Sequence, residues 1–275
     1  MIFMKKKTFI LKIGGSVLTK KNVQRPSVRK KLLQEIVKNL KTLLASEQNI
    51  RLILIHGAGS GGHTIAHTYN LSNGVYNDPH KRIGALKVRR ANQILNEKIF
   101  STFLDYDIPV IPLHSGSLLA TRKGNITYFS HTIIDLCFKN KSIPLLYGEM
   151  VFDEESGMSV CSGDLIAFYL AEKYNASRVL FASDVEGIYS EDPFKNKNAS
   201  LIKDSSLKDL VKNKNITLSG SHNIDVTGGI YNKIQSLKNN ISPSIQDVII
   251  FNGLRPENFL HITKKNPPGT KIILS

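Results

Sequence analysis

Residues 50–63 read Ile50-Arg-Leu-Ile-Leu-Ile-His56-Gly57-Ala-Gly-Ser-Gly-Gly-His63. The apolar run that opens this stretch is typical of a buried strand, and a glycine-rich turn follows it directly. Residues 8–13 form a similar apolar run, which ends at Gly14, Gly15 and Ser16. Because ligands of open α/β sheets bind at the carboxyl ends of the strands, these two stretches indicate both a fold class and the place of a site.

The rest of the chain alternates between strand and helix patterns. Apolar residues at helical spacing predict a helix over 27–45, with Ser27 as its N-cap, another over 84–104, and a third after Gly163. Short apolar runs predict strands at 108–113, 143–147, 178–182 and 247–251, and two turn signals predict hairpins at 122–125 and 154–157. This alternation favours a mainly parallel sheet covered by helices on both faces, in one domain with an internal seam near 175–180.

Composition restricts the class of protein. The chain has 275 residues, of which 41% are hydrophobic and 21% charged, and this balance indicates a globular protein. Two cysteines, Cys137 and Cys161, are too few for a disulfide framework or a four-ligand zinc site, so reduced thiols are expected. The first residues lack the pattern of a secretory signal, and no apolar run is long enough for a membrane helix. We therefore expect a cytoplasmic protein that does not engage a membrane.

Basic residues outnumber acidic ones, with 37 Lys and Arg against 22 Asp and Glu, which gives a formal net charge of +15. The basic residues are spread along the chain, and no zinc finger, RNA-recognition or basic-zipper pattern accompanies them. A nucleic-acid partner is therefore not expected. A positive field that attracts small anionic molecules explains the charge better.

Glycine recurs after four apolar runs, at residues 14–15, 57–62, 163 and 228–229. Glycine lets a backbone approach a ligand closely, and N–H groups at a helix start are good phosphate donors. None of the loops is a Walker A loop or a dinucleotide fingerprint, and no protein-kinase signature is present. Four such loops predict two phosphorylated ligands, or one ligand and a nucleotide.

Charged residues beside these loops are candidates for the chemistry. Lys12 stands inside an apolar strand, where an ammonium group is costly unless it is paired. Asp164 follows Ser162-Gly163 at a helix start, where it either caps the helix or orients the lysines. His63 closes the second loop and could donate a hydrogen bond to a phosphate. His63 and His67 lack the intervening Glu of a zinc motif, so no metal site is expected.

The order of these motifs resembles the amino acid kinase superfamily. The motifs are Lys12-Ile-Gly-Gly-Ser16, His56-Gly-Ala-Gly-Ser-Gly-Gly-His63, Ser162-Gly-Asp164, Ser183-Asp-Val-Glu-Gly-Ile-Tyr189 and Asp225-Val-Thr-Gly-Gly229. Within the superfamily, His63 and the stretch 218–229 resemble the isopentenyl phosphate kinases. The resemblance covers about residues 8–274.

This resemblance implies an open αβα sandwich in which an N-terminal lobe, about 1–175, binds the acceptor and a C-terminal lobe, about 176–275, binds ATP. The implied catalytic residues are Lys12, Lys21, His63 and Asp164. The implied acceptor-binding residues are Gly57, Ala58, Gly59, His63 and Gly163. The implied nucleotide-binding residues are Lys12, Gly14, Gly15, Ser183, Asp184, Gly187, Tyr189, Gly228, Gly229 and Lys233. Mg²⁺ is expected to arrive with ATP, and the family suggests a homodimer.

The expected reaction is therefore ATP-dependent phosphorylation of isopentenyl phosphate to isopentenyl diphosphate. Alternatives are a fosfomycin kinase or another small-acceptor kinase of this fold, and a nucleotide-binding protein without catalysis. Three positions depart from the family pattern: Gly61 replaces an aromatic residue, Lys20-Lys21 replaces Asp-Lys, and Glu186 replaces Asp. The acceptor tail is expected in an apolar slot between the second loop and the helix at 84–104. Candidates for the slot are Ile83, Leu86, Ile94 and Leu113.

Overall fold

A computed structural model describes residues 6–20, 27–191, 196–212 and 245–274. Its centre is an eight-stranded sheet with the strand order β12-β14-β13-β11-β1-β4-β8-β5. In that order the strands span Asp204–Ser206, Thr270–Ile273, Asp247–Asn252, Arg178–Ser183, Lys7–Ile13, Ile50–His56, Ile143–Tyr147 and Val110–Pro112. Among the described strands, neighbours in this sheet run parallel except β13 and β14, which confirms the predicted mainly parallel sheet.

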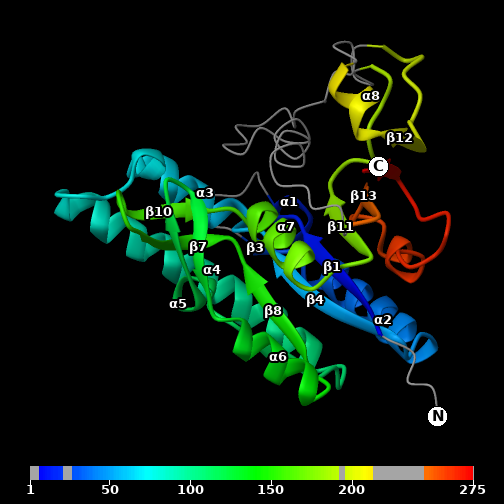
Figure 1. The fold of residues 1–275 in the computed structure, drawn as a ribbon, viewed down its shortest axis with the longest axis horizontal. Coiled ribbons are helices and arrows are strands. Elements are labelled where there is room, and N and C mark those ends of the chain that lie inside the picture. Colours follow the sequence, from blue (N-terminus) through cyan, green and yellow to red (C-terminus); the bar gives the residue numbers. More distant parts are fainter. Residues whose placement is uncertain (1–5, 21–26, 192–195, 213–244, 275) are drawn as a thin grey trace.

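Helices cover both faces of this sheet. The helices are α1 Gly15–Leu18, α2 Lys30–Ser46, α3 Gly59–Thr68, α4 Pro79–Leu104, α5 Ser115–Leu118, α6 His131–Lys139, α7 Gly163–Lys173 and α8 Leu207–Lys212, with 3-10 turns η1 Leu71–Asn73 and η2 Pro256–Leu260. Successive strand residues point to opposite faces, so β1 sends Ile10 into one core cluster with α6 and α7, and Leu11 into another with α2, α4 and η2. Figure 1 shows the resulting elongated molecule, with the outer end of α4 far from α8 and β12.

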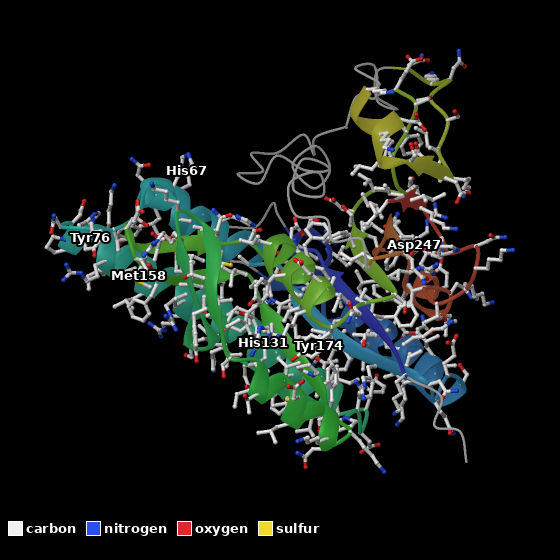
Figure 2. All side chains as sticks on the ribbon, viewed as in Figure 1. His67, Tyr76, His131, Met158, Tyr174 and Asp247 are labelled. Atoms are coloured by element: carbon white, nitrogen blue, oxygen red, sulfur yellow. The ribbon has the colours of Figure 1, made fainter. Side chains whose placement is uncertain are left out.

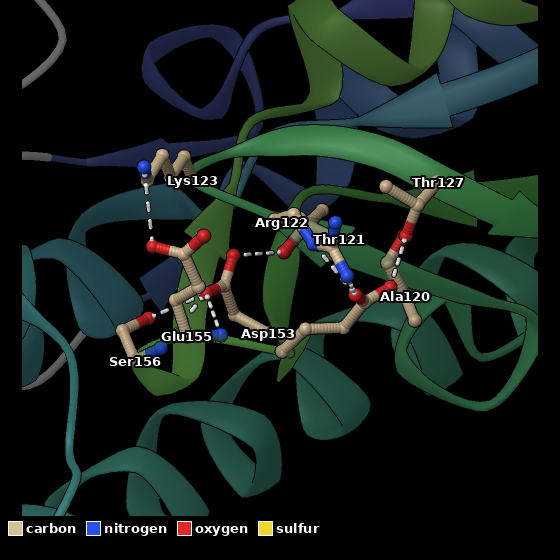
Figure 3. Close-up of polar contacts among 9 residues, drawn as sticks. Ala120, Thr121, Arg122, Lys123, Thr127, Asp153, Glu155 and Ser156 are labelled. Carbon is tan, nitrogen blue, oxygen red and sulfur yellow. Dashed lines mark hydrogen bonds and ion pairs between the residues drawn. The ribbon is translucent and has the colours of Figure 1, made fainter.

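A second, four-stranded sheet carries the two predicted hairpins. Its order is β10-β9-β6-β7, spanning Gly157–Cys161, Glu149–Asp153, Leu119–Arg122 and Asn125–Phe129. Asp153 joins the two turns because its carboxylate accepts hydrogen bonds from the backbone N–H of Ser156 and the hydroxyl of Thr121 (Figure 3). It also accepts one from the backbone N–H of Gly124. Burial alone would raise the pKa of Asp153, but these hydrogen bonds hold it well below its usual range.

Two helix starts differ from the sequence prediction. Ser27 is not an N-cap, because it pairs with Lys20 in a short ladder of β2 Thr19–Lys20 and β3 Ser27–Val28, and α2 begins three residues later. The helix predicted from residue 84 begins at Pro79, where the Asp78 side chain accepts a hydrogen bond from the Lys81 N–H at 2.9 Å. Proline at the first helical position after an Asp cap is a strong start signal.

The C-terminal strands are held by a buried ion pair. Arg178 on β11 makes two hydrogen bonds to Asp247 on β13, at 2.5 and 2.8 Å, and also donates to the carbonyl oxygens of Ile262 and Lys264. Figure 2 labels Asp247 in this part of the molecule, and it labels Tyr76 and Met158 at the opposite end. Among the described helices, none is both long and apolar enough to cross a lipid bilayer.

Candidate active site

Glycine-bearing segments meet at the carboxyl ends of adjacent strands. The chain proceeds from β1 to β4 on one side and later adds β11 on the other side, so β1 lies at a topological switch point. Ligands of open α/β sheets bind at such a point. The predicted loops after β1 and β4, and the loop before α7, all lie at this edge.

The first two glycine loops touch each other through their backbones. A Cβ atom added to Gly15 would lie 2.6 Å from the backbone nitrogen of Gly59, and one added to Gly57 would lie 2.6 Å from that of Gly15. Gly59 also adopts a φ of +65°, which favours glycine. The hydroxyl of Thr19 donates to the Gly15 carbonyl at 2.9 Å and accepts from the Ser60 N–H at 3.1 Å, so it links both loops.

Lys12 and Asp164 form an ion pair beside these loops. The Lys12 ammonium group donates to the Asp164 carboxylate, and the two side chains are 11% and 13% exposed. Asp164 lies in the first turn of α7, where the helix dipole favours a carboxylate, and the Ser162 hydroxyl caps that helix by accepting from the Leu165 N–H. A Cβ atom on Gly163 would lie 3.2 Å from Cε of Lys12. Asp164 therefore pairs with the largely buried lysine and also favours the helix start.

The second loop opens α3. Its N-cap is Ala58, which has no side chain that can accept a hydrogen bond from the first turn. His63 is half-buried in the same helix, two residues after the half-buried Gly61. The predicted acceptor-phosphate residues 57–59 and His63 thus lie on one continuous segment, which runs from the end of the loop after β4 into the first turns of α3.

A neutral histidine underlies this loop. His56 at the end of β4 stacks on Tyr147 of β8, with ring centroids 4.8 Å apart, and contacts the Gly57 carbonyl and the Asn96 side chain through its two ring nitrogens. Burial lowers the pKa of His56 to about 4. The imidazole is therefore uncharged at neutral pH and adds no cation beside Lys12.

Buried and partly buried polar residues lie next to Gly148, which follows the carboxyl end of β8. Glu149 is 1% exposed, and one of its carboxylate oxygens accepts a hydrogen bond from the Gly116 N–H at 2.8 Å. The other oxygen forms an ion pair with Arg89, whose Nε lies 3.6 Å away. Burial raises the pKa of the Glu149 carboxyl. His114 contacts the Tyr147 hydroxyl at 2.6 Å on the same side.

The predicted nucleotide residues Ser183, Asp184, Gly187 and Tyr189 lie at the end of β11 and in the segment that follows it. Ser183 ends the strand, and its hydroxyl lies 3.5 Å from a carboxylate oxygen of Asp184. Gly187 packs against Thr270, and Tyr189 pairs with Leu201 in an isolated antiparallel β-bridge. Glu186, the departure from the family pattern, pairs with Arg255 and accepts a hydrogen bond from Asn252, whose strand is the neighbour of β11.

Four predicted residues lie outside the described part of the chain, namely Lys21, Gly228, Gly229 and Lys233. Lys20 is described and is exposed on β2.

Three of the four residues expected to line the acceptor slot are exposed, whereas the fourth, Leu113, is partly buried and packs against the core cluster that contains Ile10. Ile83, Leu86 and Ile94 are each about half exposed, whereas the residues of α4 that face α3 include Gly84 and Asn92. Helical periodicity turns the first three away from the glycine loop. Between α3 and α4 lies a small apolar cluster that also involves β9 and β10. Its buried members are Leu71, Val75, Ala85, Val88, Met150 and Met158.

Sequence reasoning missed Thr19, Asn92 and Glu149, which are all buried. Asn92 stands at helical spacing among buried apolar residues of α4, and that spacing was the available signal. For Thr19 the signal was its place four residues after Gly15, one helical turn along.

Comparisons with known proteins agree with this geometry. The model of the amino acid kinase family matches residues 7–252. Isopentenyl phosphate kinase of Methanocaldococcus jannaschii is 31% identical over 271 residues, covering 97% of this chain and 98% of the relative. That of Thermoplasma acidophilum is 31% identical over 263 residues, covering 96% and 99%.

Solved structures give the same result. An X-ray structure of isopentenyl phosphate kinase superposes with a TM-score of 0.80 at 25% identity, covering 96% of this chain and 99% of the other. A product complex of the T. acidophilum enzyme gives 0.75 at 27% identity, with the same coverage. The resemblance indicated by the motifs is confirmed, and the chain belongs to the amino acid kinase family.

Proposed function

We propose that this protein transfers the γ-phosphoryl group of ATP to isopentenyl phosphate and so forms isopentenyl diphosphate. The observation that carries the proposal is the backbone contact between Gly15 and Gly59, which puts two phosphate-type loops side by side next to the Lys12–Asp164 pair. The relatives named above, which align over nearly the whole chain, support the choice of acceptor.

The reaction needs no covalent intermediate on the protein. An oxygen of the acceptor phosphate forms a bond to the γ-phosphorus while the bond from that phosphorus to the β-phosphate oxygen breaks, and ADP leaves. Lys12 neutralises charge on the migrating group, and Asp164 keeps its ammonium group aimed at the loops. His63 and the N–H groups of residues 57–59 hold the acceptor phosphate.

The remaining roles follow the family pattern. Gly14 and Gly15 lie against the ATP phosphates, Gly163 closes over the acceptor, and Ser183 with Asp184 borders the nucleotide. Gly187 and Tyr189 border it too, and Lys21, Gly228, Gly229 and Lys233 complete the phosphate contacts. On this proposal the chain is one domain, 1–275, with the acceptor on the N-terminal lobe and ATP on the C-terminal lobe.

The donor set fits Mg²⁺ held mainly by ATP. Among the described residues, no group of three or more His, Cys, Asp or Glu could hold a metal ion. Mg²⁺ keeps several waters and commonly binds through substrate phosphates with one or two carboxylates, so a dedicated protein cage is not needed. When bound, the ion neutralises phosphate charge.

We place the acceptor's hydrocarbon tail against the apolar cluster between α3 and α4. Val88, Met150 and Met158 belong to it, and methionine adapts its shape to an irregular partner. Met150 of this cluster directly follows Glu149, and Val88 lies one turn of α4 before Asn92. The cluster is therefore within reach of the acceptor-phosphate loop.

A homodimer through the outer face of α4 completes the proposal. Ile83, Leu86, Ile94 and Leu104 are 49–59% exposed and lie on one side of this helix. An antiparallel pair that sets Ile83 of one copy against Leu104 of the other also sets Arg90 against Glu97. Light scattering should report a dimer that Leu86→Glu converts to a monomer, whereas the same change at exposed Tyr128 on β7 should leave the dimer intact.

We expect the protein to act in the cytoplasm.

The activity is tested by ADP release with Mg-ATP against a panel of acceptors. We expect turnover with isopentenyl phosphate and dimethylallyl phosphate, and none with UMP, aspartate or acetylglutamate. Turnover with fosfomycin alone would assign the same residues to a phosphonate acceptor. ATP binding without ADP release for any acceptor would indicate a non-catalytic nucleotide-binding protein.

A further inference from the structure

Asn92 is a fully buried amide on the otherwise apolar inner face of α4. It is 0% exposed, between Val88 at 4% and Leu95 at 6%. Its Nδ2 donates to the Gly148 carbonyl at 3.1 Å, while its Oδ1 has no hydrogen-bond partner within the described part of the chain. An unsatisfied buried carbonyl oxygen is unfavourable for folding, so packing alone does not account for asparagine here.

The two sides of this amide face the two halves of the candidate site. A Cβ atom on Gly62 would lie 2.7 Å from Oδ1 of Asn92, so the turn of α3 that precedes His63 rests directly on the amide oxygen. On the other side, a Cβ atom on Gly148 would lie 2.6 Å from the backbone nitrogen of Gly163. Gly163 in turn packs against the Lys12 side chain.

We propose that Asn92 is a positioning residue that sets the distance between the acceptor-phosphate loop and the Lys12–Asp164 pair. The inference rests on the proposed function for its role in catalysis. Asn92 touches neither substrate. It acts through Gly62 on the turn that bears His63, and through Gly148 on the start of α7.

The chemistry of an amide suits both contacts. Its N–H group fixes the Gly148 carbonyl, and its small oxygen lets Gly62 approach more closely than a methyl group would. Leucine has the same branching but loses the donor and pushes α3 outward. Aspartate keeps the shape but presents a second acceptor to the Gly148 carbonyl, so that segment is released.

The test compares Asn92→Leu and Asn92→Asp with Thr102→Val. Thr102 is a buried polar residue of the same helix, 8% exposed, whose hydroxyl donates to the Lys98 carbonyl away from the site. Hydrogen exchange is followed in segments 57–64 and 148–166, and KM is measured separately for isopentenyl phosphate and ATP.

Asn92→Leu should speed exchange in both segments, whereas Asn92→Asp, which keeps the shape beside Gly62, should speed it in 148–166 alone. Both variants should raise KM for isopentenyl phosphate by about tenfold, while KM for ATP changes by less than about twofold. Thr102→Val should change neither. Exchange that stays at the wild-type rate in both segments, or equal increases in both KM values, would overturn the proposal. Absence of turnover by the wild-type protein would refute the acceptor assignment instead, and exchange would still decide the role of Asn92.

Discussion

Gly15→Ala tests the contact between the two phosphate loops. The added Cβ atom would lie 2.6 Å from the Gly59 nitrogen and 2.7 Å from its Cα, whereas ordinary contacts begin at 3.4 Å. The loops must therefore separate by 0.8 Å at this point, and both atoms belong to backbone, which cannot rotate away. A misplacement on the order of 1 Å in a reacting pair costs about 10²-fold in rate.

We expect Gly15→Ala to lower kcat for ADP release by about 10²-fold, which corresponds to about 2.7 kcal/mol in the barrier. Gly124→Ala is the control. Its Cβ atom meets nothing within 4 Å, but its φ of +77° disfavours a side chain, so about 1 kcal/mol of stability is lost without a change in rate. The reasoning fails if Gly15→Ala retains kcat within about threefold of wild type.

Three further predictions concern charged and titratable groups. Asp164→Asn leaves the Lys12 ammonium nearly buried without its carboxylate, so kcat should fall by about 10²–10³-fold, and a normal kcat would contradict the assigned role. The lowered pKa of His56 means that the unfolded chain binds a proton between about pH 6.5 and 4 that the folded chain excludes. As the pH is lowered from about 6.5 to 4, the free energy of unfolding should therefore decrease by up to about 3 kcal/mol more in wild type than in His56→Gln. Urea unfolding at a series of pH values measures this difference, and parallel pH profiles would refute it. Asp247→Asn removes the carboxylate that pairs with buried Arg178 and should cost about 3–5 kcal/mol of unfolding free energy, with a loss below about 1 kcal/mol as the contrary result.

Local patterns predicted β1, β4, β5, β8, β11 and β13 of the large sheet, and the three glycine loops that the structure describes. The strands over 50–56 and 143–147 agree with the structure at both ends, because continuous apolar runs between turn residues are a local signal. A partner for Lys12 could also be predicted from the sequence, since a lysine inside an apolar strand requires one. Because Lys12 and Asp164 are 152 residues apart, only the order of the motifs along the chain indicated that Asp164 is that partner.

Features that depend on three-dimensional packing could not be predicted. Ile83 and Leu86 look like core residues because apolar side chains favour burial, but they lie on the exposed side of α4. Asn92 shows the reverse case, because its helical spacing puts it on the buried face with Val88 and Leu95 but does not identify what its polar side chain contacts. Only the position of α3 across α4 reveals that this amide faces Gly62.

Phosphorus NMR of the wild-type protein with Mg-ATP and isopentenyl phosphate tests the central claim most directly. Our account predicts that the monophosphate signal is replaced by the two coupled signals of an alkyl diphosphate, in equal amount to the ADP formed. ADP that accumulates while the monophosphate signal persists, or a mixture that stays unchanged, would contradict transfer to the phosphate of this acceptor.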